Sequence, residues 1–179
     1  DLTGGPVGGV MFQWDGVSRW RPVGVVTLIN TDVFSGTNVT TEQLLKTVTL
    51  PAGLPGCVRS IVAKAENGKT GTTNTNACRM RMGTTVPAST SDSQVTAGAG
   101  ISMGASLKSM GLYHELYVTS STQFEALGTQ NAQGFTNVAS SVDYPFSITV
   151  ADTDINPLNF SWSGTTNTVD SPSVRKTVI

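Results

Sequence analysis

Histidine chemistry in this chain can involve only one residue, His114, because the sequence contains a single histidine. Any nucleophile system built on Ser/His/Asp or Cys/His would need it. Residues 112–118 (LYHELYV) alternate between apolar and polar types, which predicts a β-strand. His114 falls on the apolar side with Leu112 and Leu116. We therefore expect it to point inward or toward a subunit interface as a structural histidine. The alternatives are catalysis and a trimer-interface or pH-responsive role.

The other side of the same strand carries Tyr113, Glu115 and Tyr117. Aromatic rings beside a carboxylate suit sugar binding, because a ring packs on sugar C–H groups and the carboxylate accepts hydrogen bonds from hydroxyls. The same pattern is also typical of ordinary cross-strand tyrosines and of tyrosines at a subunit interface. These three residues are the candidate glycan-binding residues, and both interpretations stay open.

The sequence offers little for metals, cofactors or carboxylate catalysis. Residues 152–156 (DTDIN) alternate oxygen ligands like the start of a calcium loop. That motif continues with Gly and a distal Glu, whereas Pro157 and Leu158 follow here, so we expect a polar turn. The two cysteines and one histidine are too few for a four-ligand zinc site. The acidic residues show no pairing pattern for glycoside cleavage. We expect no metal, no cofactor and no catalytic residues.

The composition narrows the class of protein. Charged residues make up 13% of the 179 residues, against about 25% in an ordinary soluble domain. With a net charge of −1, the chain gives no electrostatic reason to bind nucleic acid or an anionic membrane. No apolar run approaches the roughly 18 residues of a membrane-spanning helix. The chain opens on Asp1 rather than Met, so we expect a fragment or a processed product.

Short alternating runs separated by Gly, Asn, Ser, Asp and Pro predict an all-β, antiparallel sandwich or barrel. Helical periodicity is nearly absent, and only Thr40–Leu45 is compatible with one helical turn. The expected strands are Val7–Trp14, Val17–Val23, Val25–Asn30, Lys46–Leu50, Cys57–Glu66, Ala77–Gly83, Ile101–Leu107, Leu112–Thr119, Gln123–Gly128, Tyr144–Val150, Leu158–Ser163 and Val174–Ile179.

The first of these strands differ in character from the rest. Asp15-Gly16 between alternating runs predicts a hairpin with a two-residue turn. That turn would place Phe12 opposite Arg19, where a cation–π contact can form. A lone hairpin is marginally stable in water, so it must pack on the body or on copies of itself, and we favour copies. The candidate trimer-stem residues are Phe12, Trp14, Arg19 and Trp20.

Strands Cys57–Glu66 and Ala77–Gly83 are expected to pair as a hairpin closed by the polar loop 67–76. In the second strand Cys78, Met80 and Met82 share one face, predicted to be core, and Arg79 and Arg81 share the other, predicted to be exposed or at an interface. This register separates the two cysteines by more than the limit for a disulfide, so we expect free thiols. The loops 67–76 and 87–100 are candidate binding loops because they are polar and long.

Several segments resemble the C-terminal domains of bacteriophage tail fibres and tailspikes. In residues 14–24, Trp-Asp-Gly followed by Arg-Trp-Arg-Pro-Val-Gly resembles a hairpin that recurs in those proteins. Residues 45–53 are similar to the strand and Pro-Ala-Gly turn that open such domains. Residues 59–66, 74–77 and 79–85 (RMRMGTT) are similar to a block of paired strands, and residues 174–179 are compatible with the closing strand.

The resemblance implies a jelly-roll-like β-sandwich head over residues 24–179, preceded by a hairpin stem over residues 1–23. It implies a homotrimer on the virion, in the phage tail, that binds a host-cell surface glycan or lipopolysaccharide. Any depolymerase would lie in a separate upstream domain. The alternatives are a purely structural trimerisation or capping domain, and a polysaccharide depolymerase built on carboxylates in this chain. A cellular lectin or a cytokine-like jelly roll is disfavoured by the fibre-like hairpin.

Overall fold

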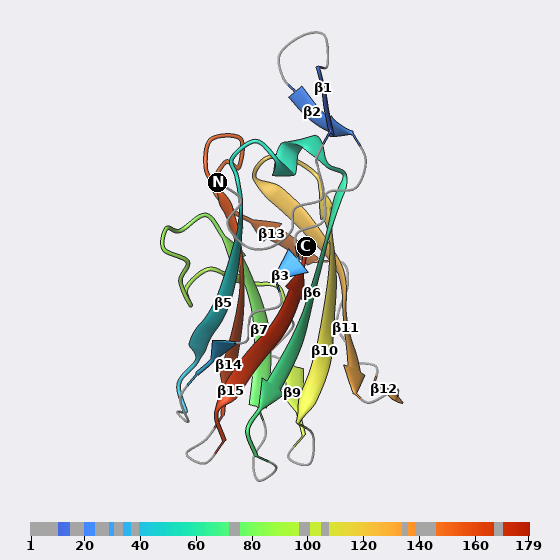
Figure 1. Ribbon diagram of the computed structural model, residues 1–179. Helices are drawn as coiled ribbons and strands as arrows, with labels where there is room; N and C mark the ends of the chain where they lie inside the picture. Colours follow the sequence, from blue (N-terminus) through green and yellow to red (C-terminus); the bar gives the residue numbers. More distant parts are fainter. Residues whose placement is uncertain are drawn as a thin grey trace.

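The computed structural model describes residues 11–14, 20–23, 29–30, 34–36, 40–71, 76–96, 101–104, 108–133, 136–138, 146–166 and 170–179. These residues form two antiparallel sheets that pack as a sandwich, with a separate two-stranded hairpin (Figure 1). Within the described residues the helical content is one 3-10 turn, η1 (Pro55–Cys57). The predicted all-β sandwich is confirmed. None of the helices in this part of the chain is long and apolar enough to cross a membrane.

One layer, the β10 sheet, has the order β12-β11-β10-β6-β15-β3, with β13 paired to β11 and β4 paired to β15. Its strands are β3 (Ile29–Asn30), β4 (Phe34–Ser35), β6 (Ser60–Lys69), β10 (Ser109–Val118), β11 (Gln123–Gln133), β12 (Thr136–Val138), β13 (Phe146–Thr149) and β15 (Pro172–Val178).

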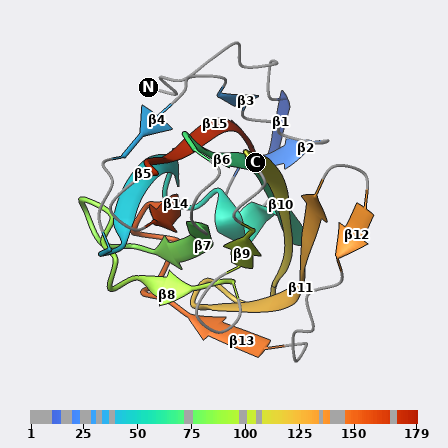
Figure 2. The ribbon, with the colours of Figure 1, turned by 90° about the horizontal axis from the view of Figure 1, so that it is seen from below.

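The other layer, the β14 sheet, has the order β5-β14-β7-β8, with β9 paired to β7. Its strands are β5 (Gln43–Leu50), β7 (Asn76–Gly83), β8 (Ser93–Gln94), β9 (Ile101–Met103) and β14 (Leu158–Thr165). In the view from below, β5, β14 and β7 lie on one side, and β15, β6, β10 and β11 curve around the other (Figure 2). The chain crosses between sheets from β5 to β6 to β7, and the late strands β14 and β15 pair with early ones. Such crossing connections are typical of a jelly roll.

Alternation along the strands places the core between the two sheets. The main apolar cluster takes Ile61, Ala63 and Ala65 from β6 and Met80, Met82, Phe160 and Trp162 from the opposite sheet. Cys78, Met80 and Met82 are completely buried, as predicted, while Arg79 and Arg81 lie half-buried on the outer side. A smaller cluster joins Cys78 to Met103, Met110 and Leu112. Burying one large apolar side chain contributes about 1.5–3 kcal/mol, so this alternation determines which face of each strand points inward.

The predicted hairpin between residues 57–66 and 77–83 is wrong. β6 pairs with β10 and β15, and β7 pairs with β14, so the intervening segment crosses from one sheet to the other. The sheets of a sandwich lie about 10 Å apart, a gap that a connection of this length spans as readily as it closes a hairpin. β6 also continues to Lys69, because Asn67 and Lys69 extend its buried face.

Two other local predictions are corrected. The helical turn over Thr40–Leu45 is wrong, because β5 begins at Gln43 and pairs with β14. In the N-terminal hairpin, β1 (Met11–Trp14) and β2 (Trp20–Val23) pair with residues 15–19 between them, and Trp14 lies opposite Trp20. Phe12 therefore lies opposite Pro22 and not Arg19, because a longer connection than two residues shifts the register.

Candidate functional site

Strand β10 separates its side chains into an inner and an outer face, as the sequence predicts. Leu112, His114 and Leu116 are buried against the core. On the outer face Tyr113 and Glu115 are half-buried, and Tyr117 is 44% exposed. The structure thus brings the three predicted glycan-binding residues to one surface that solvent can reach.

The neighbouring strands add charged residues to this surface. Lys64 of β6 lies opposite Tyr113, and its ammonium nitrogen is 5.3 Å from the centre of the Tyr113 ring. The Tyr113 hydroxyl donates a hydrogen bond to Glu115 Oε2 at 3.3 Å. Burial, the charge of Glu115 and this hydrogen bond together raise the pKa of Tyr113.

Glu125 of β11 lies opposite Tyr117 and is half-buried between the inward Phe124 and Ala126. We call Lys64, Tyr113, Glu115, Tyr117 and Glu125 the tyrosine face. Sequence reasoning missed Lys64 and Glu125, although alternation places each on the outer side of its own strand. The missing information was which strands pair with β10, because strand order is not encoded in local periodicity.

His114 occupies the inner side of the same strand. It is completely buried, and burial lowers its pKa from 6.5 to about 3. The imidazole is therefore neutral at ordinary pH and faces the core rather than the tyrosine face. Its inward orientation, predicted from the alternation, is confirmed.

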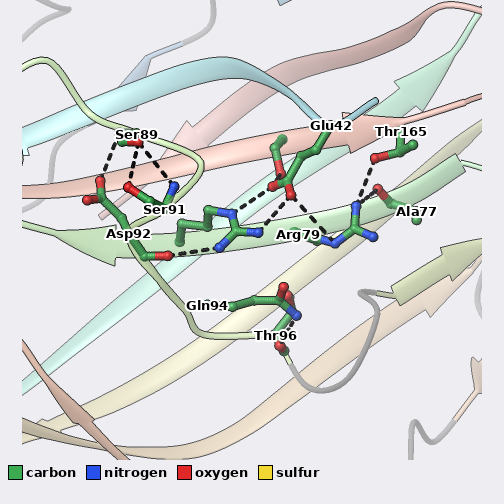
Figure 3. A network of polar contacts seen from close by, with 11 residues as sticks. Glu42, Ala77, Arg79, Ser89, Ser91, Asp92, Gln94, Thr96 and Thr165 are labelled. Atoms are coloured by element: carbon green, nitrogen blue, oxygen red, sulfur yellow. Dashed lines mark hydrogen bonds and ion pairs between the residues drawn. The ribbon is translucent and has the colours of Figure 1, made fainter. Parts of the chain in front are cut away.

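The outer side of the β14 sheet carries a second polar cluster (Figure 3). Arg81 donates two hydrogen bonds of 2.7 Å to the carboxylate of Glu42, and Ser163 donates a third at 2.5 Å. Burial acts to raise the pKa of Glu42, but the hydrogen bonds from Arg81 and Ser163 and the charges of Arg81 and Arg79 outweigh it, so the pKa is lowered. The hydrogen bonds to Glu42 in turn raise the pKa of Arg81.

The two arginines of this cluster make further hydrogen bonds within the protein. Arg79 Nη1 donates to Thr165 Oγ1 at 2.8 Å, and Arg81 Nη1 donates to the Asp92 carbonyl oxygen at 2.8 Å. The cluster ties the start of β5 to β14, β7 and the segment before β8. Because the Glu42 carboxylate, Arg79 and Arg81 bond to other groups of the protein, we assign the cluster a structural role rather than a binding one.

A buried ion pair lies at the end of β6 that is lowest in Figure 1. Lys69 Nζ is 3.4 Å from Asp170 Oδ2 and donates to the Gly71 carbonyl oxygen at 2.6 Å. Both charged side chains are almost fully buried. A Cβ added to Gly71 would lie 1.9 Å from Asp170 Oδ1, so the carboxylate needs a glycine there. The Thr166 hydroxyl donates a hydrogen bond to the Asp170 carbonyl oxygen, shortly before β15 begins.

The predicted polar turn at residues 152–156 is confirmed. Asp152 Oδ1 accepts a hydrogen bond from the Asp154 amide at 3.0 Å, and the Asp152 carbonyl accepts from the Asn156 amide at 3.0 Å. Thr153 is buried and bonds to the Ser121 carbonyl oxygen. In the part of the chain that the structure describes, no group of three or more His, Cys, Asp or Glu side chains is placed to hold a metal ion.

The other predicted site residues are only partly placed. Phe12, Trp14 and Trp20 lie in the β1–β2 hairpin, and Arg19 lies outside the described residues. The candidate loop 67–76 is shorter than predicted, because β6 runs to Lys69 and β7 begins at Asn76. The candidate loop 87–100 contains the short strand β8, which pairs with β7.

Cys78 should resist thiol reagents while the chain is folded. Its thiol is free and buried, and burial raises its pKa to about 12, so it stays protonated and shielded. In a Cys57→Ser variant, a thiol reagent should label one equivalent in denaturant and close to none in buffer at pH 8. Rapid labelling in buffer at the rate of a free thiol would contradict this placement.

Among the residues that the structure describes, the tyrosine face combines an exposed aromatic ring with carboxylates, which are features of a sugar-binding surface. In the Glu42 cluster and the Lys69–Asp170 pair, the charged groups bond to other groups of the protein. Comparison of the chain with protein-family models, with curated proteins and with solved structures finds no match.

Proposed function

We propose that this chain is the C-terminal attachment region of a bacteriophage tail fibre or tailspike. It forms a homotrimer on the virion and binds a host-cell surface glycan or lipopolysaccharide. The observation that carries the proposal is the tyrosine face, where two tyrosines and two carboxylates lie together on the outer side of a sheet of paired strands.

The chemistry of the tyrosine face matches the needs of sugar recognition. The exposed ring of Tyr117 offers an apolar surface for the C–H groups of a sugar. Glu115 and Glu125 offer carboxylate oxygens that accept hydrogen bonds from hydroxyls. Because these side chains project from paired strands rather than loops, they are held in place before the ligand arrives, which lowers the entropy cost of binding.

Trimerisation would multiply a weak contact at each tyrosine face. Three copies per fibre present three sites to one cell surface, and linked sites raise the overall affinity by about 10²–10⁴ without stronger single contacts. The β1–β2 hairpin forms its own two-stranded sheet and lies beyond the upper end of the sandwich in Figure 1. A lone hairpin is marginally stable, which favours its packing on copies of itself.

The second candidate function is structural, and the same hairpin favours it. A domain that only registers and caps the trimer needs the hairpin and the sandwich but no receptor contact. In that case the tyrosine face is a contact between subunits. The two functions predict different effects of removing the tyrosines. If the chain binds a receptor, binding is lost, and if its role is structural, assembly of the trimer changes.

Replacing both tyrosines, in Tyr113→Ala with Tyr117→Ala, should weaken binding to host cells or their purified surface glycan. We expect about a tenfold loss at each site, the equivalent of about 1.4 kcal/mol, and a larger loss for the trimer. The measurement is binding of the labelled chain to cells, with light scattering on the same samples.

The matched control is Val86→Ala with Ile155→Ala, which removes two exposed apolar side chains elsewhere and should leave binding unchanged. Unchanged binding in the tyrosine variant would overturn the proposed site. A change in oligomeric mass in that variant alone would favour the structural function. Release of reducing ends from host polysaccharide by the wild-type chain would instead support a depolymerase.

A further inference from the structure

The two tyrosines of the tyrosine face occupy similar places on β10 but have different partners on β6. Tyr113 lies opposite Lys64, and Tyr117 lies opposite Ser60. Both positions are on the outer side of β6, because the inward Ile61 and Ala63 alternate with them. On the tyrosine face, Tyr113 therefore has the cation of Lys64 opposite it, whereas Tyr117 has the short neutral side chain of Ser60 at the corresponding position.

At Tyr113 the chain itself supplies the cation. The Lys64 ammonium lies 5.3 Å from the ring centre, within the range of a cation–π interaction. The hydroxyl of the same tyrosine is bound to Glu115. A ring, an ammonium and a carboxylate therefore lie together in one cluster.

At Tyr117 an aromatic ring again lies near a carboxylate, but Ser60 occupies the position that corresponds to Lys64 at Tyr113. The ring is 44% exposed, and Glu125 lies directly opposite on β11. Residues directly opposite in an antiparallel pair have Cβ atoms about 5 Å apart, so the Glu125 carboxylate can reach a group that sits on the ring. Glu115 lies two residues away on the same side of β10.

We propose that Tyr117 takes its cation from the ligand, so that the recognised glycan carries an ammonium group, as an amino sugar with a free amine does. The inference rests on the proposed function and deepens it. The ammonium lies over the Tyr117 ring, as Lys64 does over Tyr113, and Glu125 and Glu115 neutralise it. Carboxylated or sulfated sugars are disfavoured, because the same two carboxylates repel them.

The test compares a glucosamine oligosaccharide with its N-acetylated counterpart by calorimetry on the full chain. We expect the free amine to bind about fivefold more tightly, and the difference to shrink at high salt. Choline is the third probe and should bind more weakly than the glucosamine oligosaccharide, because it lacks the sugar ring. Binding of choline as tight as that of the oligosaccharide would overturn the inference that an amino sugar is recognised. Equal binding of the two oligosaccharides, or no binding of any probe, would overturn the inference.

Two substitutions make the test specific to Tyr117. Ser60→Lys supplies the ring with an internal ammonium and should remove the preference for the free amine, and Glu125→Gln should reduce it. The control is Glu66→Gln, which removes a negative charge at another position on β6. Glu66 forms an ion pair with Arg175 of β15. An equal effect of the Glu66 and Glu125 variants would show a general charge effect and overturn the inference.

These outcomes are separate from those that test the proposed function. If the tyrosine double variant loses host binding while the free amine gives no advantage, the proposed function stands and the inference about charge fails. If host binding is unchanged in the tyrosine double variant, the proposed function itself fails.

Discussion

Replacing Asp170 with Ala should lower the free energy of unfolding by about 3–5 kcal/mol. The substitution leaves the Lys69 ammonium buried beside the Gly71 carbonyl oxygen without its counter-charge. A charge in that setting has a large desolvation cost that the carboxylate offsets in the wild-type chain. Urea unfolding followed by tryptophan fluorescence, at one fixed protein concentration, measures the loss.

The control is the double variant Lys69→Met with Asp170→Leu, which removes both charges and keeps apolar volume. It should recover most of the lost stability, because an apolar pair in place of a buried ion pair is often neutral or stabilising. Gly71→Ala should also destabilise the chain, since its Cβ would collide with the Asp170 carboxylate. An Asp170→Ala variant as stable as the wild-type chain would contradict the burial of the Lys69–Asp170 pair.

Acid should destabilise the fold through His114. The folded pKa is about 3 and the reference value is 6.5, so between these values the unfolded chain takes up a proton that the folded chain does not. Stability is thus unaffected by this group above pH 6.5 and falls as the pH decreases toward 3. The full difference corresponds to about 5 kcal/mol, and about 3 kcal/mol is lost by pH 4.5.

The His114→Leu variant isolates this effect, because the carboxylates also contribute to acid sensitivity. The difference in unfolding free energy between wild type and variant should shift by about 3 kcal/mol in favour of the variant between pH 7 and 4.5. In the wild-type chain the resonances of the one histidine should show no titration down to pH 4 while the fold persists. A titration midpoint near 6.5 in the folded chain would contradict the burial of His114.

Side-chain direction was predictable from the sequence, because a strand alternates strictly between two faces. That rule placed His114 and Met80 inside and Tyr113 and Tyr117 outside, and the structure agrees. It works without knowledge of the fold, since the apolar residues of a half-buried strand identify the inner face by themselves.

Strand pairing was not predictable in the same way. The proximity of Lys64 to Tyr113 depends on β6 lying beside β10, and the pair Lys69–Asp170 joins residues that are 101 positions apart. The register of the N-terminal hairpin depends on the number of residues between β1 and β2. The Asp-Gly pattern predicted a connection of two residues, whereas five residues separate Trp14 from its partner Trp20. The first two features are set by non-local packing, which leaves no periodic trace in the chain, and the third is set by the length of a local connection.

A crystal structure of the chain with the surface glycan purified from a susceptible host would examine the attachment proposal at the level of atoms. We predict a sugar ring stacked on Tyr117, with its polar groups bonded to Glu115 or Glu125. A glycan bound on another surface, or a tyrosine face covered by a second copy of the chain, would contradict the assignment of this face as the attachment site.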